Sequence, residues 1–337
     1  MPARLRRAAV LVAVAAAGLL GLTAPAAAAP GWQQGHLQDG FGPEGGLAVT
    51  TPATPAGRTC GTTTQAAATT VPHTISSGGR DRTVQLRLPA GYDGRKQFPL
   101  LLVFHGRGST GGEIQAFSGM DRLPAVVAYA EGIVGTGDGN RQAWQGAPYA
   151  APGVDDVAFT RDLVADLSRS LCLDRSRVYA TGKSNGGGFA GLLACRASDL
   201  VAAVAPVAAA DYPETTTPCA PRRPVPVIAF HGTADATIPY GGDADRGLPA
   251  LKDWAAGWAQ RDGCRAAPRD TATPPDITET RWRGCARGVE VALVSVAGGG
   301  HTWPGADAYS GGGVATQTIE ATDVLWTFVS RYRLQQH

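Results

Sequence analysis

The sequence lacks the usual marks of a protein that binds nucleic acid, a lipid surface or zinc. Its formal net charge is only +2, and no run of Lys or Arg occurs beyond the first seven residues. A polyanion would therefore find no basic patch to bind. None of the six cysteines forms a C-x-x-C pair, which argues against a zinc site. The chain also has no internal repeat. We expect no metal, no cofactor and no nucleic-acid partner.

Long apolar runs are also missing, except at the N-terminus. Residues 8–22 are apolar, follow three arginines and precede the small-residue sequence at 26–28. This order is typical of a secretory signal peptide. The apolar run is shorter than the roughly 20 residues that a comfortable membrane span needs. We expect cleavage after Ala28, secretion and no membrane partner afterwards; a retained N-terminal anchor is the alternative.

The mature chain divides into a short leader and one domain. Residues 29–58 are rich in Gly, Pro, Thr and Ala and show no sustained hydrophobic period, which is typical of a flexible leader. Residues 59–337 are enough for one α/β domain with a large core. We expect this domain to be a monomer.

Strand and helix patterns alternate along the domain. The predicted strands are residues 83–88, 100–104, 132–134, 177–180, 201–204, 227–230 and 289–296. The predicted helices are residues 157–171, a helix directly after Ser184, a helix around 254–258 and a closing helix at 324–332. Such alternation predicts a mostly parallel central sheet with helices on both faces. Because residues 83–88 alternate in polarity, we expect them to form an antiparallel edge strand.

The stretch "YATGKSNGGGFAGLLAC" contains the first candidate catalytic residue. Ser184 lies between Gly182 and Gly186, directly after an apolar strand and before a helical pattern. A G-x-S-x-G sequence at such a junction predicts a nucleophile elbow, in which a sharp turn leaves no room for flanking side chains. The alternative is a Gly-rich turn with an ordinary serine.

Two later loops provide an acid and a base in the order that such a nucleophile needs. Asp235 follows the strand at 227–230 in "HGTADATIPYGG", and His301 follows the strand at 289–296 in "AGGGHTWPG". The order Ser, Asp, His is that of an α/β-hydrolase triad. We expect His301 to take the proton of Ser184 and Asp235 to orient the imidazole.

Two residues compete for these roles. His231 lies four residues before Asp235 at the same strand end, so one turn would have to provide both partners; we interpret it as structural. Asp211, just past the strand at 201–204, is the alternative acid.

The stretch "FHGRGS", after the strand at 100–104, has the position of an oxyanion loop. We expect the backbone N–H groups of Arg107 and Asn185 to stabilise the developing negative charge, and His105 to brace the loop. The alternative is an ordinary strand-to-helix turn.

An even number of cysteines in an exported chain favours disulfides. Cys264 and Cys285 bracket a Pro- and Thr-rich excursion that is poor in apolar residues and cannot pack by itself. A disulfide at its base is therefore expected. The other expected pairs are Cys195 with Cys219 and Cys60 with Cys172, although six cysteines allow 15 connectivities.

The motifs together resemble those of a known family. They are "FHGRGSTGG", "AWQ", "DDVAFTRDLV", "CLDRSRVYATGKSNGGGF", "HGTADATIPYGG" and "GGGHTWP". From about residue 81 to residue 332 the chain is similar to secreted feruloyl esterases and to the related polyhydroxybutyrate depolymerase-like esterases. The resemblance implies an α/β-hydrolase fold, secretion and no metal. It also implies Ser184 as nucleophile, Asp235 as acid and His301 as base.

We therefore expect a serine esterase that acts on feruloyl esters of plant cell-wall polysaccharide. Trp144, Tyr240 and Trp303 flank the motif loops and are candidates for an aromatic shelf that contacts the substrate. Alternative activities are a polyhydroxybutyrate or short-chain polyester depolymerase, an acetyl xylan esterase and an extracellular acyltransferase. A non-catalytic cell-wall-binding protein is a further alternative, against which the complete triad argues.

Overall fold

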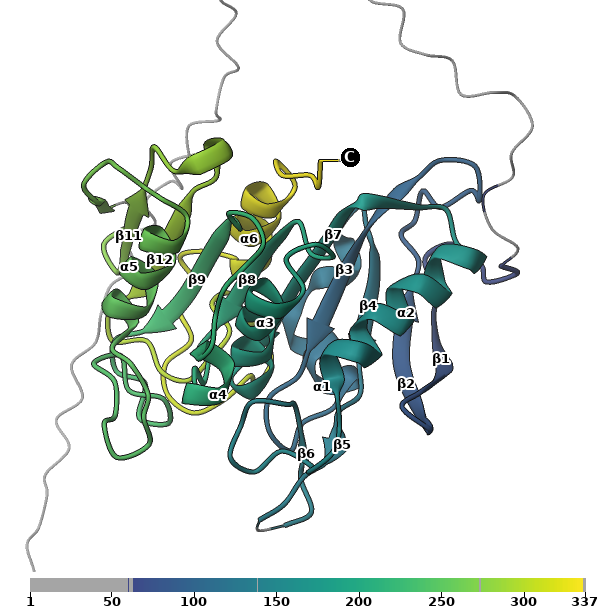
Figure 1. The fold of residues 1–337 in the computed structure, drawn as a ribbon, viewed down its shortest axis with the longest axis horizontal. Helices are drawn as coiled ribbons and strands as arrows, with labels where there is room; N and C mark the ends of the chain where they lie inside the picture. Colours follow the sequence, from purple (N-terminus) through teal and green to yellow (C-terminus); the bar gives the residue numbers. More distant parts are fainter. Residues whose placement is uncertain (1–59, 61–62, 138, 273, 336–337) are drawn as a thin grey trace, which may run out of the picture. The chain divides into compact units, whose positions relative to one another are not determined.

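The computed structural model describes residues 60, 63–137, 139–272 and 274–335 (Figure 1). The expected signal peptide at 1–28 and leader at 29–58 lie outside the described residues. Within the described ranges, no helix has both the length and the apolar character that crossing a membrane requires.

A ten-stranded sheet forms the centre of the domain, in the order β1-β2-β4-β3-β7-β8-β9-β12-β11-β10. Its strands are β1 (Thr70–Ser77), β2 (Arg80–Arg87), β3 (Phe98–Phe104), β4 (Val126–Ala130), β7 (Leu173–Lys183), β8 (Ala203–Val207), β9 (Val227–Gly232), β10 (Arg269–Ala272), β11 (Ile277–Trp282) and β12 (Val291–Val296). The run from β4 to β12 is parallel, whereas both ends of the sheet pair antiparallel. This is the mostly parallel sheet of an α/β-hydrolase fold, as the sequence predicts.

Helices cover both faces of this sheet (Figure 1). They are α1 (Gly111–Ser118), α2 (Asp156–Ser170), α3 (Asn185–Arg196), α4 (Pro213–Thr216), α5 (Leu251–Arg261) and α6 (Ala321–Val329), with 3₁₀ turns η1 (Met120–Arg122) and η2 (Ala286–Gly288). Strand β3 shows how the core divides, because successive side chains point to opposite faces. Leu100 and Leu102 pack in one apolar cluster with α2, α3 and α5, and Leu101 packs in a second cluster with α1 and α6.

Two expectations about the first half of the sheet were wrong. The strand predicted at 83–88 is β2, which lies between β1 and β4 and is not an edge strand. The edge is the largely exposed β1, whose polar composition hides it in the sequence. The strand predicted at 132–134 is β5 (Ile133–Val134), which pairs only with β6 (Gln142–Ala143) outside the main sheet. The place in the sheet belongs to β4, all of whose residues are buried.

The segment between Cys264 and Cys285 is not the unpacked loop that its composition predicts. It contains β10 and β11, an antiparallel hairpin that extends the sheet beyond β12. Ile277 and Trp282 are buried there, so a few apolar residues are enough to attach the hairpin. The interpretation of this segment as an unpacked loop was therefore wrong.

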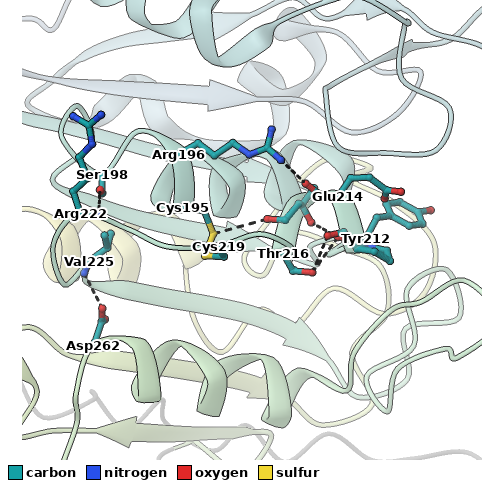
Figure 2. The surroundings of a disulfide bond; sticks show 12 residues. Cys195, Arg196, Ser198, Tyr212, Glu214, Thr216, Cys219, Arg222, Val225 and Asp262 are labelled. Carbon is teal, nitrogen blue, oxygen red and sulfur yellow. Dashed lines mark hydrogen bonds between the residues drawn. A yellow bond between two sulfur atoms is a disulfide. The ribbon is translucent and has the colours of Figure 1, made fainter.

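Two of the three expected disulfides are present. The structure joins Cys195 to Cys219 and Cys264 to Cys285. Figure 2 shows the first of these, which ties the end of α3 to the segment after α4; beside it, Arg196 donates a hydrogen bond to the backbone oxygen of Glu214 at 3.4 Å.

The third expected pair is not bonded, because Cys60 and Cys172 are free thiols. The two thiols are neighbours without a bond between them, and both also contact backbone oxygens. Cys172 Sγ contacts the Cys60 oxygen at 2.5 Å and the Gly94 oxygen at 2.8 Å, and Cys60 Sγ contacts the Arg95 oxygen at 3.4 Å.

Removal of the Cys264–Cys285 disulfide by double substitution to serine is expected to destabilise the fold without abolishing chemistry. A bridge that closes a sequence separation of 21 residues contributes about 3 kcal/mol in the chain-entropy model. Urea unfolding of the variant measures this loss, and Cys60→Ser, which changes a free thiol, is the matched control. Peptide mapping of the non-reduced protein should also find Cys60 and Cys172 alkylated. A map that joins Cys264 to another cysteine would contradict the assignment.

Candidate active site

Ser184 occupies a sharp turn between β7 and α3. Its φ is 57° and its ψ is −122°, a conformation that is rare for a residue with a side chain and persists only where the surroundings enforce it. Gly182 and Gly186 are needed because a Cβ on either would lie 2.5 Å or less from the backbone oxygen of Phe104. This is the geometry that the G-x-S-x-G sequence predicts for a nucleophile elbow.

The backbone of Ser184 is held by hydrogen bonds on both sides. Its N–H donates to the Val207 oxygen at 3.0 Å, and its oxygen accepts from the N–H groups of Gly188 and Ala210 at 3.0 and 2.9 Å. These contacts fix the turn to the end of β8 and to the first turn of α3. The side chain therefore projects from a rigid support into the cavity described below.

His301 and Asp235 meet at the C-terminal ends of β12 and β9. His301 Nδ1 donates to Asp235 Oδ2 at 2.8 Å, which leaves Nε2 free to act as a base. Asp235 Oδ1 accepts from the N–H groups of Thr237 and Ile238, both at 2.8 Å. The carboxylate is thereby fixed in orientation by its own loop.

The charge states of this pair follow from burial and hydrogen bonding. Burial alone would raise the pKa of Asp235, but hydrogen bonds from His231 and His301 outweigh it and lower that pKa. Burial lowers the pKa of His301, with the nearby Lys183 ammonium adding to the effect and Asp235 opposing it. At neutral pH the pair is therefore an ionised carboxylate beside a neutral imidazole, the state that a general base requires.

Ser184 and His301 line one cavity of about 650 Å³. Among the hydrogen bonds of the described residues, none joins the Ser184 hydroxyl to His301. Such contacts are often long in the absence of substrate and tighten when it binds. The cavity brings together the three residues that the sequence predicts, since Asp235 holds His301 from behind.

The two backbone N–H groups predicted for an oxyanion hole belong to Asn185, next to Ser184, and to Arg107, next to a glycine that packs on Ser184. Gly106 packs against Ser184, and a Cβ on it would lie 3.4 Å from the serine Cβ. Within the described chain, the N–H groups of Arg107 and Asn185 donate to no backbone oxygen. They remain our candidates for the oxyanion hole.

His105 braces this loop and does not face the cavity. It is fully buried, its Nε2 accepts from the Gly132 N–H at 3.0 Å, and its Nδ1 therefore donates to the Gly106 oxygen at 2.7 Å. Burial lowers its pKa to about 4, so the ring is neutral and serves as a fixed link.

Neither rival residue has the contacts of a catalytic group. His231 Nε2 lies 2.8 Å from the Ile238 oxygen and 3.3 Å from Asp235 Oδ2, so it supports the acid loop from the buried side. Asp211 lies against Trp254 and faces a different cavity. Burial raises its pKa to about 7, and its Oδ1 has no hydrogen-bond partner among the described residues.

The expected aromatic shelf was wrong in its members. Trp144 and Trp303 are 0% and 1% exposed, so neither side chain can reach a substrate. Trp144 stacks on Phe189. The Tyr240 hydroxyl forms a 2.7 Å hydrogen bond with Ser295 Oγ, and Tyr240 does not line the cavity. The aromatic residues that do line the cavity are Phe117, Tyr149, Tyr212 and Tyr309. Phe117 lies on α1, whereas the three tyrosines lie in segments without a periodic pattern, where only nearness to the motifs could have indicated them.

Comparisons with known proteins place the chain among esterases. It is 32% identical over 233 residues to feruloyl esterase B of Piromyces equi and covers 42% of that protein's length. It is 32% identical over 269 residues to the putative esterase NocK of Nocardia uniformis subsp. tsuyamanensis; the match covers 71% of this chain and 75% of the relative. It is 27% identical over 239 residues to feruloyl esterase D of Neurospora crassa and covers 76% of it. No protein-family model matches the chain.

Solved structures support the fold. An acetyl xylan esterase from Aspergillus awamori superposes with a TM-score of 0.53 at 14% identity, covering 77% of this chain and 99% of that structure. Esterase 2 of Thermogutta terrifontis superposes with a TM-score of 0.50, also at 14% identity, and covers 78% and 94%. At this identity the likeness concerns the fold alone.

Asp235→Asn is expected to reduce kcat by about 10⁴, because an amide cannot hold His301 in the productive tautomer. Asp211→Asn should change kcat little, since Asp211 contacts neither Ser184 nor His301. Steady-state rates on p-nitrophenyl acetate, with circular dichroism to check folding, measure both. A large loss for Asp211→Asn together with a small one for Asp235→Asn would move the acid to the earlier loop.

The pH dependence of kcat/KM should report His301. Because the base must be neutral, activity is lost as the pH falls through the His301 pKa, and that pKa lies below the ordinary value of 6.5. A titration of kcat/KM from pH 4 to 8 should therefore rise with a midpoint below 6.5. A flat profile, or a midpoint above 7, is incompatible with His301 as the base.

Proposed function

The chain belongs to the feruloyl esterase family of carboxylic ester hydrolases, and we propose that it is a secreted serine esterase acting on hydroxycinnamoyl esters of plant cell-wall polysaccharide. The observation that carries this proposal is Ser184 on a strained elbow beside the 2.8 Å His301–Asp235 pair. The feruloyl esterases among its relatives support the acyl group.

The first half of the reaction transfers the acyl group to the enzyme. His301 Nε2 accepts the Ser184 proton while Oγ attacks the ester carbonyl carbon. The carbonyl oxygen becomes an oxyanion that accepts hydrogen bonds from the N–H groups of Arg107 and Asn185, each worth about 10²–10³ in rate. The imidazolium then donates its proton to the leaving alcohol oxygen, and the C–O bond breaks.

The second half releases the acid. A water molecule takes the place of the alcohol, and His301 removes its proton as the water oxygen attacks the acyl-serine carbonyl carbon. The bond between that carbon and Ser184 Oγ then breaks, the imidazolium returns the proton to Oγ, and the carboxylic acid leaves. Asp235 remains ionised throughout and stabilises the imidazolium. The aromatic side chains of Phe117, Tyr149 and Tyr212 provide apolar area for a planar acyl group.

The two disulfides support an extracellular location, because such bonds persist in oxidising compartments. We assign residues 1–28 to a secretory signal peptide, 29–58 to a leader and 59–337 to the esterase domain, which we take to be monomeric. Feruloylated polysaccharide or its fragments are the proposed partner.

Ser184→Ala is expected to lower kcat by about 10⁶ while leaving a folded protein. Ser168→Ala, which changes a serine on α2, is the matched control and should keep full activity. The substrates to compare are methyl ferulate, p-nitrophenyl acetate, acetylated xylan and a hydroxybutyrate oligomer. Each is assayed for free acid and, with added alcohol, for ester product.

Methyl ferulate is expected to give the highest kcat/KM of the natural-type esters. Near-normal turnover by Ser184→Ala would overturn the elbow assignment. Preference for acetylated xylan or for the hydroxybutyrate oligomer would replace the substrate class, and predominant ester product with an acceptor alcohol would make the protein an acyltransferase.

A further inference from the structure

The cavity in front of Ser184 has a strong excess of positive charge. The charged residues among those that line it are Arg107, Arg141, Lys183, Arg246 and Glu113. The single carboxylate, Glu113, is already used in the helix cap of α1, where it accepts from the Ser109 hydroxyl and the Thr110 N–H. A neutral ester would need none of these cations.

Lys183 is the most unusual of the four cations. It is the last residue of β7, directly precedes Ser184 and is only 6% exposed. No hydrogen bond or ion pair of the described residues involves its ammonium, and Asp235 is the carboxylate that attracts it. Burial lowers its pKa to about 8, with attraction from Asp235 opposing the shift, so it remains largely charged at pH 7. A largely buried cation without an ion pair is less well solvated than an exposed one, and a ligand of opposite charge would stabilise it.

The surrounding loop makes room for this ammonium. Gly311 lies against it, and a Cβ on Gly311 would be 2.8 Å from Lys183 Nζ and 1.9 Å from the His301 oxygen. The lysine therefore lies on the His301 side of the nucleophile. His301 must reach the leaving oxygen in order to protonate it, so this is the side that the alcohol portion of the ester occupies.

Two of the arginines are also without acidic partners among the described residues. The Arg107 guanidinium lies 4.3 Å from the centre of the Tyr149 ring, which holds it at the cavity. Arg141 packs against Gly108, where a Cβ would lie 3.0 Å from its Cδ. Arg246 differs, since it pairs with Asp243 at 2.6 Å. Among the described residues, Lys183, Arg107 and Arg141 are thus the lining cations without a carboxylate partner.

We propose that this cavity selects esters whose alcohol portion carries a carboxylate, with Lys183 as the principal anion-binding residue and Arg141 assisting. The inference rests on the proposed esterase function and specifies its substrate: a hydroxycinnamoyl ester of an acidic polyol or uronic acid. The carboxylate forms a charge-assisted contact with the Lys183 ammonium and orients the leaving oxygen toward His301.

The test compares two substrates that differ only in this charge. Caffeate release is measured from 5-O-caffeoylquinate and from its methyl ester, at pH 7 and low ionic strength. The wild-type protein should favour the carboxylate by about tenfold in kcat/KM, the effect of one hydrogen bond to a charged group. Lys183→Met should reduce this ratio to near one, Arg141→Gln should reduce it partly, and added salt should reduce it in the wild type.

Arg175→Gln is the matched control. Arg175 is an exposed residue of the same strand, about 26 Å from Lys183, and its loss changes the net charge equally without touching the cavity. Its ratio should equal that of the wild type. A matched pair with the charge in the acyl group, p-nitrophenyl hemiglutarate against p-nitrophenyl butyrate, should show no such preference; a preference there would overturn the placement on the alcohol side.

A binding measurement separates this inference from the proposed function. In the Ser184→Ala background, calorimetry should find that Lys183→Met weakens caffeoylquinate binding about tenfold and binding of the methyl ester little. If the wild type releases caffeate from neither ester, the proposed function fails. If it cleaves both equally and Lys183→Met lowers both rates alike while raising the midpoint of the pH profile, Lys183 only tunes His301 and the inference is wrong. Should Lys183→Met not fold, Arg141→Gln and the salt dependence still decide.

Discussion

The candidate chemistry of the molecule depends on a close approach of two backbone segments. The oxygen of Phe104, at the end of β3, lies so near Gly182 and Gly186 that no side chain fits at either position. This contact lets α3 begin directly against the sheet and holds Ser184 at a φ of 57°. A larger residue at either glycine would move α3 and the loop after β3 apart. Ser184 and the N–H groups of the oxyanion loop would then both be displaced, because the same contact positions both.

The two aspartates beside this elbow show that contacts, and not position along the chain, decide which one can serve the histidine. Both follow strands of the parallel sheet and both are buried. Asp235 receives hydrogen bonds from two backbone N–H groups and from His301, so its charged form is stabilised and its pKa is lowered. Asp211 lacks a partner for one oxygen, and burial raises its pKa to about 7. An ionised carboxylate can orient an imidazolium, whereas a half-neutral one provides little charge for it.

The sequence predicts what is fixed by backbone rules and misses what is fixed by packing. Ser184, Asp235 and His301 could be predicted because residues after successive parallel strands meet at one edge of the sheet. Trp144 was assigned to the cavity wrongly, since sequence cannot tell an aromatic residue facing a cavity from one facing the core next to it. Strand β1 was missed because an exposed edge strand has few apolar residues. The third cysteine pair was also predicted wrongly. Cys60 and Cys172 lie beside each other without a bond, and the order of cysteines along a chain does not set the geometry that a disulfide needs.

The low exposure of the candidate catalytic pair, His301 and Asp235, also determines the environment of Lys183. Water is largely excluded around His301 and Asp235, which strengthens the hydrogen bond between them and keeps the imidazole neutral. The same exclusion leaves the neighbouring ammonium poorly solvated, and its charge acts on His301 by lowering that pKa further. A lysine at this position thus costs stability and reduces the basicity of the catalytic imidazole. A carboxylate brought by the substrate removes both effects at once: it neutralises the ammonium and raises the basicity of His301 at the moment when the base is needed. A substrate with an acidic alcohol portion therefore gives Lys183 a role in the reaction. With a neutral substrate, the loss of stability and of His301 basicity that Lys183 causes would have no compensation.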